Sequence, residues 1–198
     1  MSNIKLVHSG GNSVSLTTPT SNPSSNVTFK LPGADGTAGQ VLQTDGNGNL
    51  TWTDNTPMWL VRLSSTYNHT STNTWVTAPL ASEAFDTDSA FNTSNYTFTV
   101  PSGKAGKYVL YYQQQVNDNP DDGENIQGRI NKNGSPLDYS YTISLSPGTN
   151  KTTIVGKTFV ETLAVGDTLT MWLYHHEGGT VTYSASQTYF GGYKLLGG

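Results

Sequence analysis

The sequence contains no cysteine, and this absence removes several kinds of chemistry at once. Without thiols the chain can form no disulfide bond, offer no cysteine nucleophile and bind no metal through sulfur. If the protein works outside a cell, we therefore expect its resistance to unfolding to come from assembly and not from cross-links.

Charged residues are also scarce, at 12% of the chain with a net charge of −4. No two basic residues stand next to each other, so the sequence lacks the basic patch with which nucleic-acid-binding proteins neutralise phosphates. No apolar run reaches the roughly 18 residues that predict a membrane-spanning helix. The first residues lack the apolar core of a signal peptide, which argues against Sec-type secretion.

Helical periodicity is missing as well, and the remaining pattern is typical of strands. Aromatic residues make up 11% of the chain and can supply large buried faces. Tyr96, Phe98 and Val100 alternate with threonines, as in a strand with one buried face. A Pro-Ser-Gly turn ends this strand, and residues 107–116 form a longer one rich in aromatic and β-branched residues. The pattern predicts an all-β protein.

The strands divide the chain into two parts. Residues 57–198 contain roughly ten short strands separated by turns, which predicts an antiparallel sandwich that we call the head. In residues 1–56, alternation over Val27–Leu31 predicts a short strand, and Gly39–Asp54 predicts a hairpin closed by the turn Asp45–Gly48. Such short strands cannot bury a core alone. We therefore expect this N-terminal segment to trimerise or to anchor the protein on a larger partner.

Four motifs of the head follow the order known from the complement C1q and tumour-necrosis-factor superfamily. The first is Phe-Asn, Asn-Tyr-x-Phe-x-Val-Pro, Gly and Tyr within residues 91–108, followed by GRINKNG at 128–134. LAVGDTLTMWLY at 163–174 and TYFGGYKLL at 188–196 complete the set. The head resembles this superfamily, which implies a jelly roll of two antiparallel sheets and assembly into homotrimers.

Aromatic residues occupy both faces of the strand patterns at 107–113 and 170–176. A sandwich core buried on one side only would need fewer, so we expect one face to pack between the sheets and the other between subunits. The candidates for the trimer interface or the core are Tyr111, Trp172, Tyr174, Phe190 and Tyr193.

The run from Leu31 to Trp52 resembles a segment that recurs in phage fibre and virion structural proteins. It has the form Leu-Pro, then Asp-Gly-Thr-Ala-Gly-Gln-Val-Leu-Gln-Thr-Asp-Gly, then Gly-x-Leu-x-Trp. In those proteins the segment commonly precedes a globular or receptor-facing part. The resemblance implies a place on the virion surface, on the capsid or the tail, with other virion proteins as partners. The anchoring candidates are Leu31, Val41, Leu42, Leu50 and Trp52.

Two groups of side chains could bind a metal, but neither is favoured. His175 and His176 are adjacent in a predicted strand and point to opposite faces, so one chain cannot hold a metal with both. Three copies of one of them around an axis could do so, yet an exposed or interfacial histidine is the default. The acidic loop Asp118–Glu124 could hold calcium, although its spacing does not match an EF-hand. We predict no metal and no cofactor, and leave calcium at this loop as an open alternative.

Sugar stacking is a further alternative for aromatic residues, if they are exposed in loops. The candidates are Trp75, Tyr139, Tyr141 and Tyr183. Most aromatic residues in strand patterns belong instead to a core or an interface.

These observations predict a phage virion structural protein, a homotrimeric short fibre, spike or capsid decoration protein that displays a jelly-roll head. The alternative is a tail-associated receptor-binding protein that recognises a host-surface glycan or protein. An enzyme is not expected, because nothing couples a histidine to a serine and a carboxylate. The sequence also gives no positional signal for a pair of carboxylates in a hydrolytic cleft.

Overall fold

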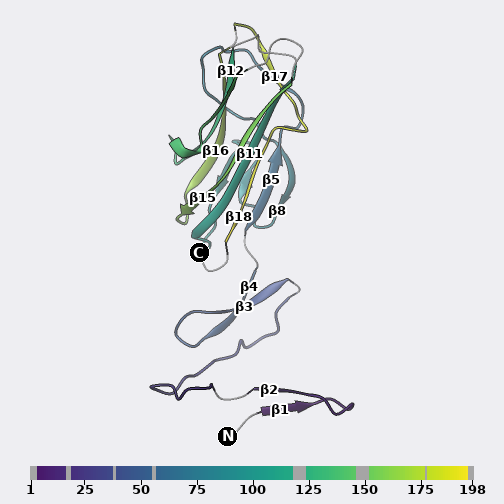
Figure 1. The fold of residues 1–198 in the computed structure, drawn as a ribbon, viewed down its shortest axis with the longest axis vertical. Helices are drawn as coiled ribbons and strands as arrows, with labels where there is room; N and C mark the ends of the chain where they lie inside the picture. Colours follow the sequence, from purple (N-terminus) through teal and green to yellow (C-terminus); the bar gives the residue numbers. More distant parts are fainter. Residues whose placement is uncertain are drawn as a thin grey trace. The chain divides into compact units, whose positions relative to one another are not determined.

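The computed structural model describes residues 4–16, 19–37, 39–54, 57–117, 124–145, 152–176 and 178–195. Their regular secondary structure is almost entirely β-strand, which confirms the predicted fold class (Figure 1). They belong to two compact units, Met1–Asn55 and Thr56–Gly198. The described part holds a single helical element, the 3-10 turn η1 (Asp138–Ser140), and no helix that is long and apolar enough to cross a membrane.

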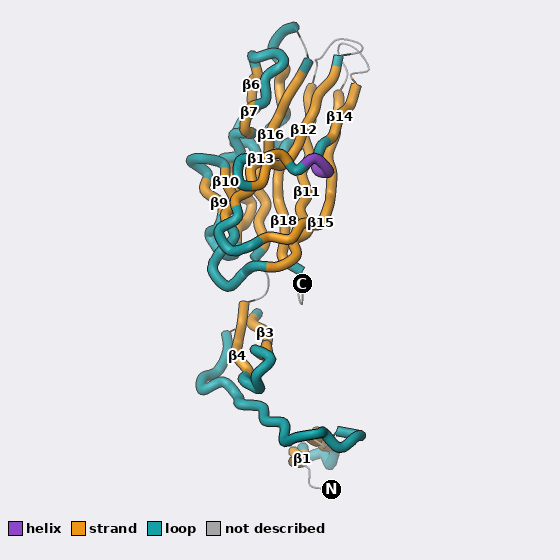
Figure 2. The backbone as a smooth tube through the Cα atoms, turned by 90° about the vertical axis from the view of Figure 1, so that its left-hand side faces the viewer, coloured by secondary structure: helices purple, strands orange, loops and turns teal. Residues whose placement is uncertain are grey.

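The head, formed by the second unit, is a sandwich of two antiparallel sheets (Figures 1 and 2). The first sheet contains β5 (Met58–Arg62), β6 (Tyr67–His69), β8 (Ser82–Asp86), β11 (Gly106–Asn117), β15 (Thr152–Leu163), β17 (Val181–Tyr183) and β18 (Tyr189–Lys194). The second sheet contains β7 (Val76–Thr77), β9 (Phe91–Asn92), β10 (Thr97–Thr99), β12 (Asn125–Lys132), β13 (Ser135–Pro136), β14 (Thr142–Leu145) and β16 (Thr168–His175). Strands β8, β5, β18, β11 and β15 lie in that order across the first sheet.

The core between the sheets is built around Trp59 of β5. Its indole stacks on Phe98 at a centroid distance of 3.6 Å and meets the edge of Phe190 at 5.6 Å. Phe98 in turn contacts the ring of Tyr108 at 6.1 Å. All four side chains are fully buried. The alternation predicted along residues 107–116 is therefore real, because every second side chain of β11 enters this core.

Two adjacent glycines of the FGGY motif explain how the rings fit. Gly191 lies on the outward face of β18 and Gly192 faces the core. A Cβ at Gly192 would lie 2.6 Å from the tip of the Trp59 indole and 2.8 Å from the carbonyl oxygen of Val109. The second contact is with backbone and cannot relax by a side-chain rotation.

Replacing Gly192 by alanine is therefore expected to destabilise the head by about 1–3 kcal/mol, the usual cost of overpacking a core. Thermal unfolding followed by circular dichroism would show this as a lower melting temperature. Gly178→Ala is the matched control, because a Cβ at Gly178 meets no atom within 4 Å. An equal melting temperature for the two variants would contradict the packing argument.

The turns of three of the four motifs, those at 91–108, 128–134 and 163–174, meet at one end of the sandwich. Lys132 of the Lys-Asn-Gly turn lies 3.1 Å from the carboxylate of Asp167, and the Asn133 amide donates to the same carboxylate at 2.8 Å. These hydrogen bonds, with that of Asn133 first, lower the pKa of Asp167. The amide of Gly166 donates to the carbonyl of Val100 at 3.0 Å. The turns of these three motifs thus hold this end of the sandwich together.

Three predicted strands are wrong in detail. Tyr96 is not in β10 but in the preceding turn, with a φ of 59°. The pattern PLDYSYTISL at 136–145 predicts one strand, but the structure divides it. Ser140 is buried and its hydroxyl accepts a hydrogen bond from the Ile130 amide, which holds the η1 turn between β13 and β14. Val27–Leu31 forms no strand; there is one isolated bridge, between Lys30 and Asn49.

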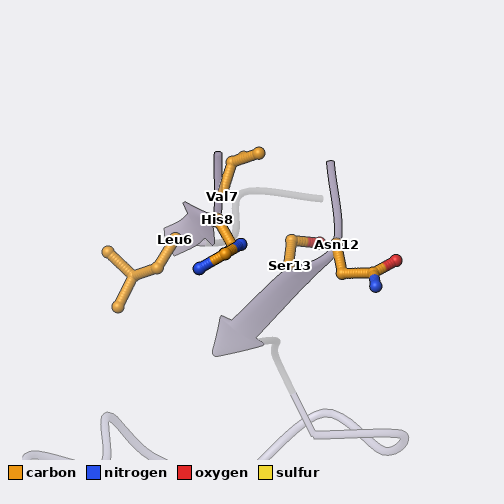
Figure 3. A pocket seen from close by; sticks show the side chains of 5 residues that line it. All are labelled: Leu6, Val7, His8, Asn12 and Ser13. Carbon is orange, nitrogen blue, oxygen red and sulfur yellow. The ribbon is translucent and has the colours of Figure 1, made fainter. Parts of the chain in front are cut away.

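The first unit consists of two separate hairpins, β1 (Ile4–Val7) with β2 (Ser13–Leu16) and β3 (Gln40–Thr44) with β4 (Leu50–Asp54). Its large apolar side chains stay exposed wherever they are described, apart from Leu50, which is half-buried. Five side chains surround an open hollow of about 480 Å³ in the first hairpin, and they point in different directions (Figure 3). The described residues of this unit thus form strands but bury no core of their own.

Candidate interaction surfaces

The outward face of the first sheet carries a continuous apolar row across four strands. The backbone register places Met58, Tyr193, Val109 and Val160 side by side on β5, β18, β11 and β15. Three of them are exposed by 40% or more, and Val109 is half-buried. No charged side chain belongs to this row. We call the row and the one below it the apolar face.

The second row of the apolar face contains Phe85, Leu60, Gly191 and Tyr111. The Tyr111 ring covers Gly191, where a Cβ would lie 2.7 Å from the phenol oxygen. Burial of the Tyr111 hydroxyl raises the pKa of Tyr111, and the neighbouring Tyr189 and Tyr193 raise it further. The absent side chain of Gly191 thus lets an aromatic ring lie flat on the sheet and extends the apolar surface.

Polar side chains border the apolar face along the same strands. The next row contains Arg62, Tyr189 and Gln113, and the Gln113 amide donates to the Gln187 carbonyl at 3.1 Å. A hollow of about 390 Å³ lies between these rows. An apolar centre with a polar border is the usual composition of a protein–protein interface.

One edge of the sandwich is also apolar and exposed. Among the described strands, β14 pairs with β12 alone and β15 with β11 alone, so these two strands are the edges of their sheets. Ile143 and Leu145 of β14 are each more than 50% exposed. An edge strand offers unpaired backbone groups together with these side chains to a partner. We call this surface the apolar edge.

The predicted interface or core residues divide among three places. Tyr111 and Tyr193 lie on the apolar face, whereas Phe190 belongs to the core. Trp172 and Tyr174 lie on the outward face of the second sheet, away from Tyr111 and Tyr193. Sequence analysis missed Met58, Leu60, Phe85, Val109 and Val160. The alternation within each strand indicates that these residues share a face with other apolar side chains. It does not indicate which strands are neighbours.

The two histidines of the pair lie in different surroundings. His175 is fully buried, so the expectation of an exposed or interfacial residue is wrong for it, while His176 is exposed and its ring lies 2.6 Å from the Glu124 carboxylate. No group of three metal-binding side chains occurs in the described ranges. Asp118, Asp121 and Asp122 lie outside the described residues, so calcium binding at their loop stays an open alternative.

The anchoring candidates lie in or next to the second hairpin of the first unit. Trp52 packs over Gly36, where a Cβ would lie 2.6 Å from the indole, and its Nε1 donates to the Ala34 carbonyl at 3.0 Å. Gly48 approaches the Thr28 carbonyl closely, and its φ is 85°. These contacts give Gly36 and Gly48 of the Leu31–Trp52 motif a physical reason. Leu31, Val41, Leu42 and Trp52 remain between 37% and 76% exposed.

Comparisons with known proteins identify the fold of the head. Neither a protein-family model nor a characterised protein matches the sequence. The globular domain of zebrafish complement 1qA protein is 14% identical, with a TM-score of 0.50, and the match covers 71% of this chain and 98% of that one. Murine APRIL gives a TM-score of 0.54 at 14% identity, over 71% of this chain and 99% of that one. Eiger TNF from S. frugiperda gives a TM-score of 0.51 at 14% identity, and the match covers 72% of this chain and 92% of that one. The head therefore has the jelly-roll fold of complement C1q and TNF-family domains, as its motifs predicted.

Proposed function

We propose that the protein is a homotrimeric structural protein on the surface of a phage particle, a short fibre, spike or capsid decoration protein that displays the head. The observation that carries the homotrimer in this proposal is the apolar face. Met58, Tyr193 and Val160 lie side by side and uncovered, and a soluble monomer seldom leaves such a row in water.

A second copy of the chain is the occupant that best fits this face. Each head has both an apolar face and an apolar edge, and these are two different surfaces. When two different surfaces of identical chains pair head to tail, the assembly closes into a ring if the rotation allows it. The C1q and TNF resemblance supplies the number of copies, which is three.

The first unit would anchor the trimer on the particle. Its hairpins expose apolar side chains and bury none of them fully in the described part. They need a partner to cover them, either the same hairpins of two other chains or a capsid or tail protein. The phage assignment itself is supported by the Leu31–Trp52 resemblance, whose glycines and tryptophan form the compact hairpin contacts described above.

Electron microscopy of intact particles with a gold-tagged antibody against residues 57–198 tests the virion assignment. We expect gold on the particle surface. Gold over the capsid would identify a head decoration or head fibre, and gold confined to the tail would favour the receptor-binding alternative. Particles that contain the protein by mass spectrometry but bind no gold, with the same antibody labelling the purified protein, would contradict surface display.

A further inference from the structure

Five side chains gather on the outward face of the second sheet, on the opposite side of the sandwich from the apolar face. Trp172 and Tyr174 come from β16, and Arg129 of β12 stands directly opposite Trp172 in the register. Trp75 immediately precedes β7, and Tyr141 immediately precedes β14. We call this group the Arg129 platform.

Trp75 is the centre of the platform. Its ring lies 5.2 Å from that of Tyr174 and 6.3 Å from that of Tyr141, measured between centroids. The Arg129 guanidinium carbon lies 3.9 Å above the same indole and 5.8 Å from the Trp172 ring. The loop before Trp75 holds this indole in place through Asn73. The Asn73 side-chain oxygen accepts a hydrogen bond from the Tyr174 hydroxyl at 2.8 Å, and the Asn73 backbone N–H donates to the His175 carbonyl at 3.0 Å.

The guanidinium of Arg129 is oriented by these rings, and no described residue accepts a hydrogen bond from it. Its Nε is buried without a hydrogen bond, and none of the described carboxylates forms an ion pair with it. Burial lowers the pKa of Arg129, with Asp138 and Tyr141 acting in the opposite direction, and a guanidinium remains protonated in proteins. An Arg that stacks on aromatic rings keeps its planar edge free for a carboxylate, which it can bind through two hydrogen bonds.

Amide side chains continue the platform along β12. Gln127 stands opposite Tyr174, and its amide donates to Asn125 at 2.7 Å. Side chains at 125, 127 and 129 share one face of the strand. The surface therefore offers aromatic rings, one unpaired cation and two amides within a few strand positions.

We infer that the Arg129 platform binds a carboxylated sugar unit of the uronic or sialic acid type. The rings take the apolar face of the sugar, Arg129 takes its carboxylate, and Gln127 and Asn125 take hydroxyl groups. The chain as a whole has a net charge of −4, so general attraction of anions does not account for such binding. All the residues come from one head, so the site does not depend on the trimer or on the phage assignment.

The test is saturation-transfer NMR and titration of tryptophan fluorescence with sialyllactose and with a glucuronic-acid disaccharide, using lactose as the neutral probe. We expect at least one of the two acidic sugars to bind and lactose to bind at least tenfold more weakly, as for the loss of a hydrogen bond to a charged group. Arg129→Lys keeps the charge but loses the planar edge, and it should weaken binding roughly tenfold or more.

The control is Arg62→Lys, which changes the same residue type on the first sheet and should leave binding unchanged. If Arg129 only packs the loop onto the sheet, Arg129→Lys will lower the melting temperature and affect all sugars equally. That outcome would overturn the proposal, and so would the absence of binding to both acidic sugars. Neither outcome alters the gold-labelling result, which tests the proposed function separately.

Discussion

Replacing Val160 by glutamate is expected to convert the protein from a trimer into monomers. Val160 is 53% exposed in the single chain and ends the apolar row on β15, so the carboxylate costs the isolated head little. In the proposed trimer the same position is covered by another copy, and an unpaired buried carboxylate costs several kcal/mol. Each ~1.4 kcal/mol weakens association tenfold. The molar mass from light scattering should therefore fall to about a third.

Val165→Glu is the matched control for this experiment. Val165 has a similar exposure, 52%, but lies in the turn between β15 and β16 and outside the apolar face. It should leave the mass unchanged. Circular dichroism of both variants would check that the head is still folded. A wild-type protein that is monomeric at micromolar concentration, or a Val160→Glu variant that keeps the wild-type mass, would contradict the proposed interface.

The apolar face shows why the sequence predicted the sandwich but only part of the interface. Alternation within each strand identifies which side chains share a face, and this was enough to place Tyr111 and Tyr193 among the candidates. The row itself joins Met58, Val109, Val160 and Tyr193, which are up to 135 residues apart in the chain (193 minus 58). Only the strand order and register bring them together. Sequence periodicity carries no information about that pairing.

Glycines were informative only as part of motifs. Gly191 and Gly192 stand in a motif that resembles the C1q and TNF superfamily, and the structure gives the physical reason for them: the Tyr111 ring covers Gly191 and the Trp59 ring covers Gly192.

The Arg129 platform was the least predictable site. Trp75 and Tyr141 were candidates for sugar stacking, Trp172 and Tyr174 for an interface, and Arg129 was not considered. They form one group because β7 and β14 begin beside β16 and β12.

A pair of histidines in the core provides the last prediction, a loss of stability in mild acid. His69 and His175 are buried with their rings edge to face, 4.4 Å apart, and neither ring nitrogen of His69 has a hydrogen-bond partner. Burial, with a smaller effect of His175, lowers the pKa of His69 from 6.5 to about 4. Around it lie the rings of Tyr67 and Tyr183, which carry no charge at these pH values.

The sign of the effect follows from where the proton binds. Between pH 6.5 and about 4, His69 takes up a proton in the unfolded chain but not in the folded one, so the free energy of unfolding falls as the pH falls through this range. The full shift is worth about 3 kcal/mol. Denaturant unfolding at fixed protein concentration should show the loss, and His69→Phe, which cannot be protonated, should reduce the pH dependence. His176→Gln removes an exposed histidine instead and should keep it, since a surface ion pair such as that with Glu124 contributes about 1 kcal/mol or less. If His69→Phe retains the wild-type slope, the destabilising proton binds elsewhere.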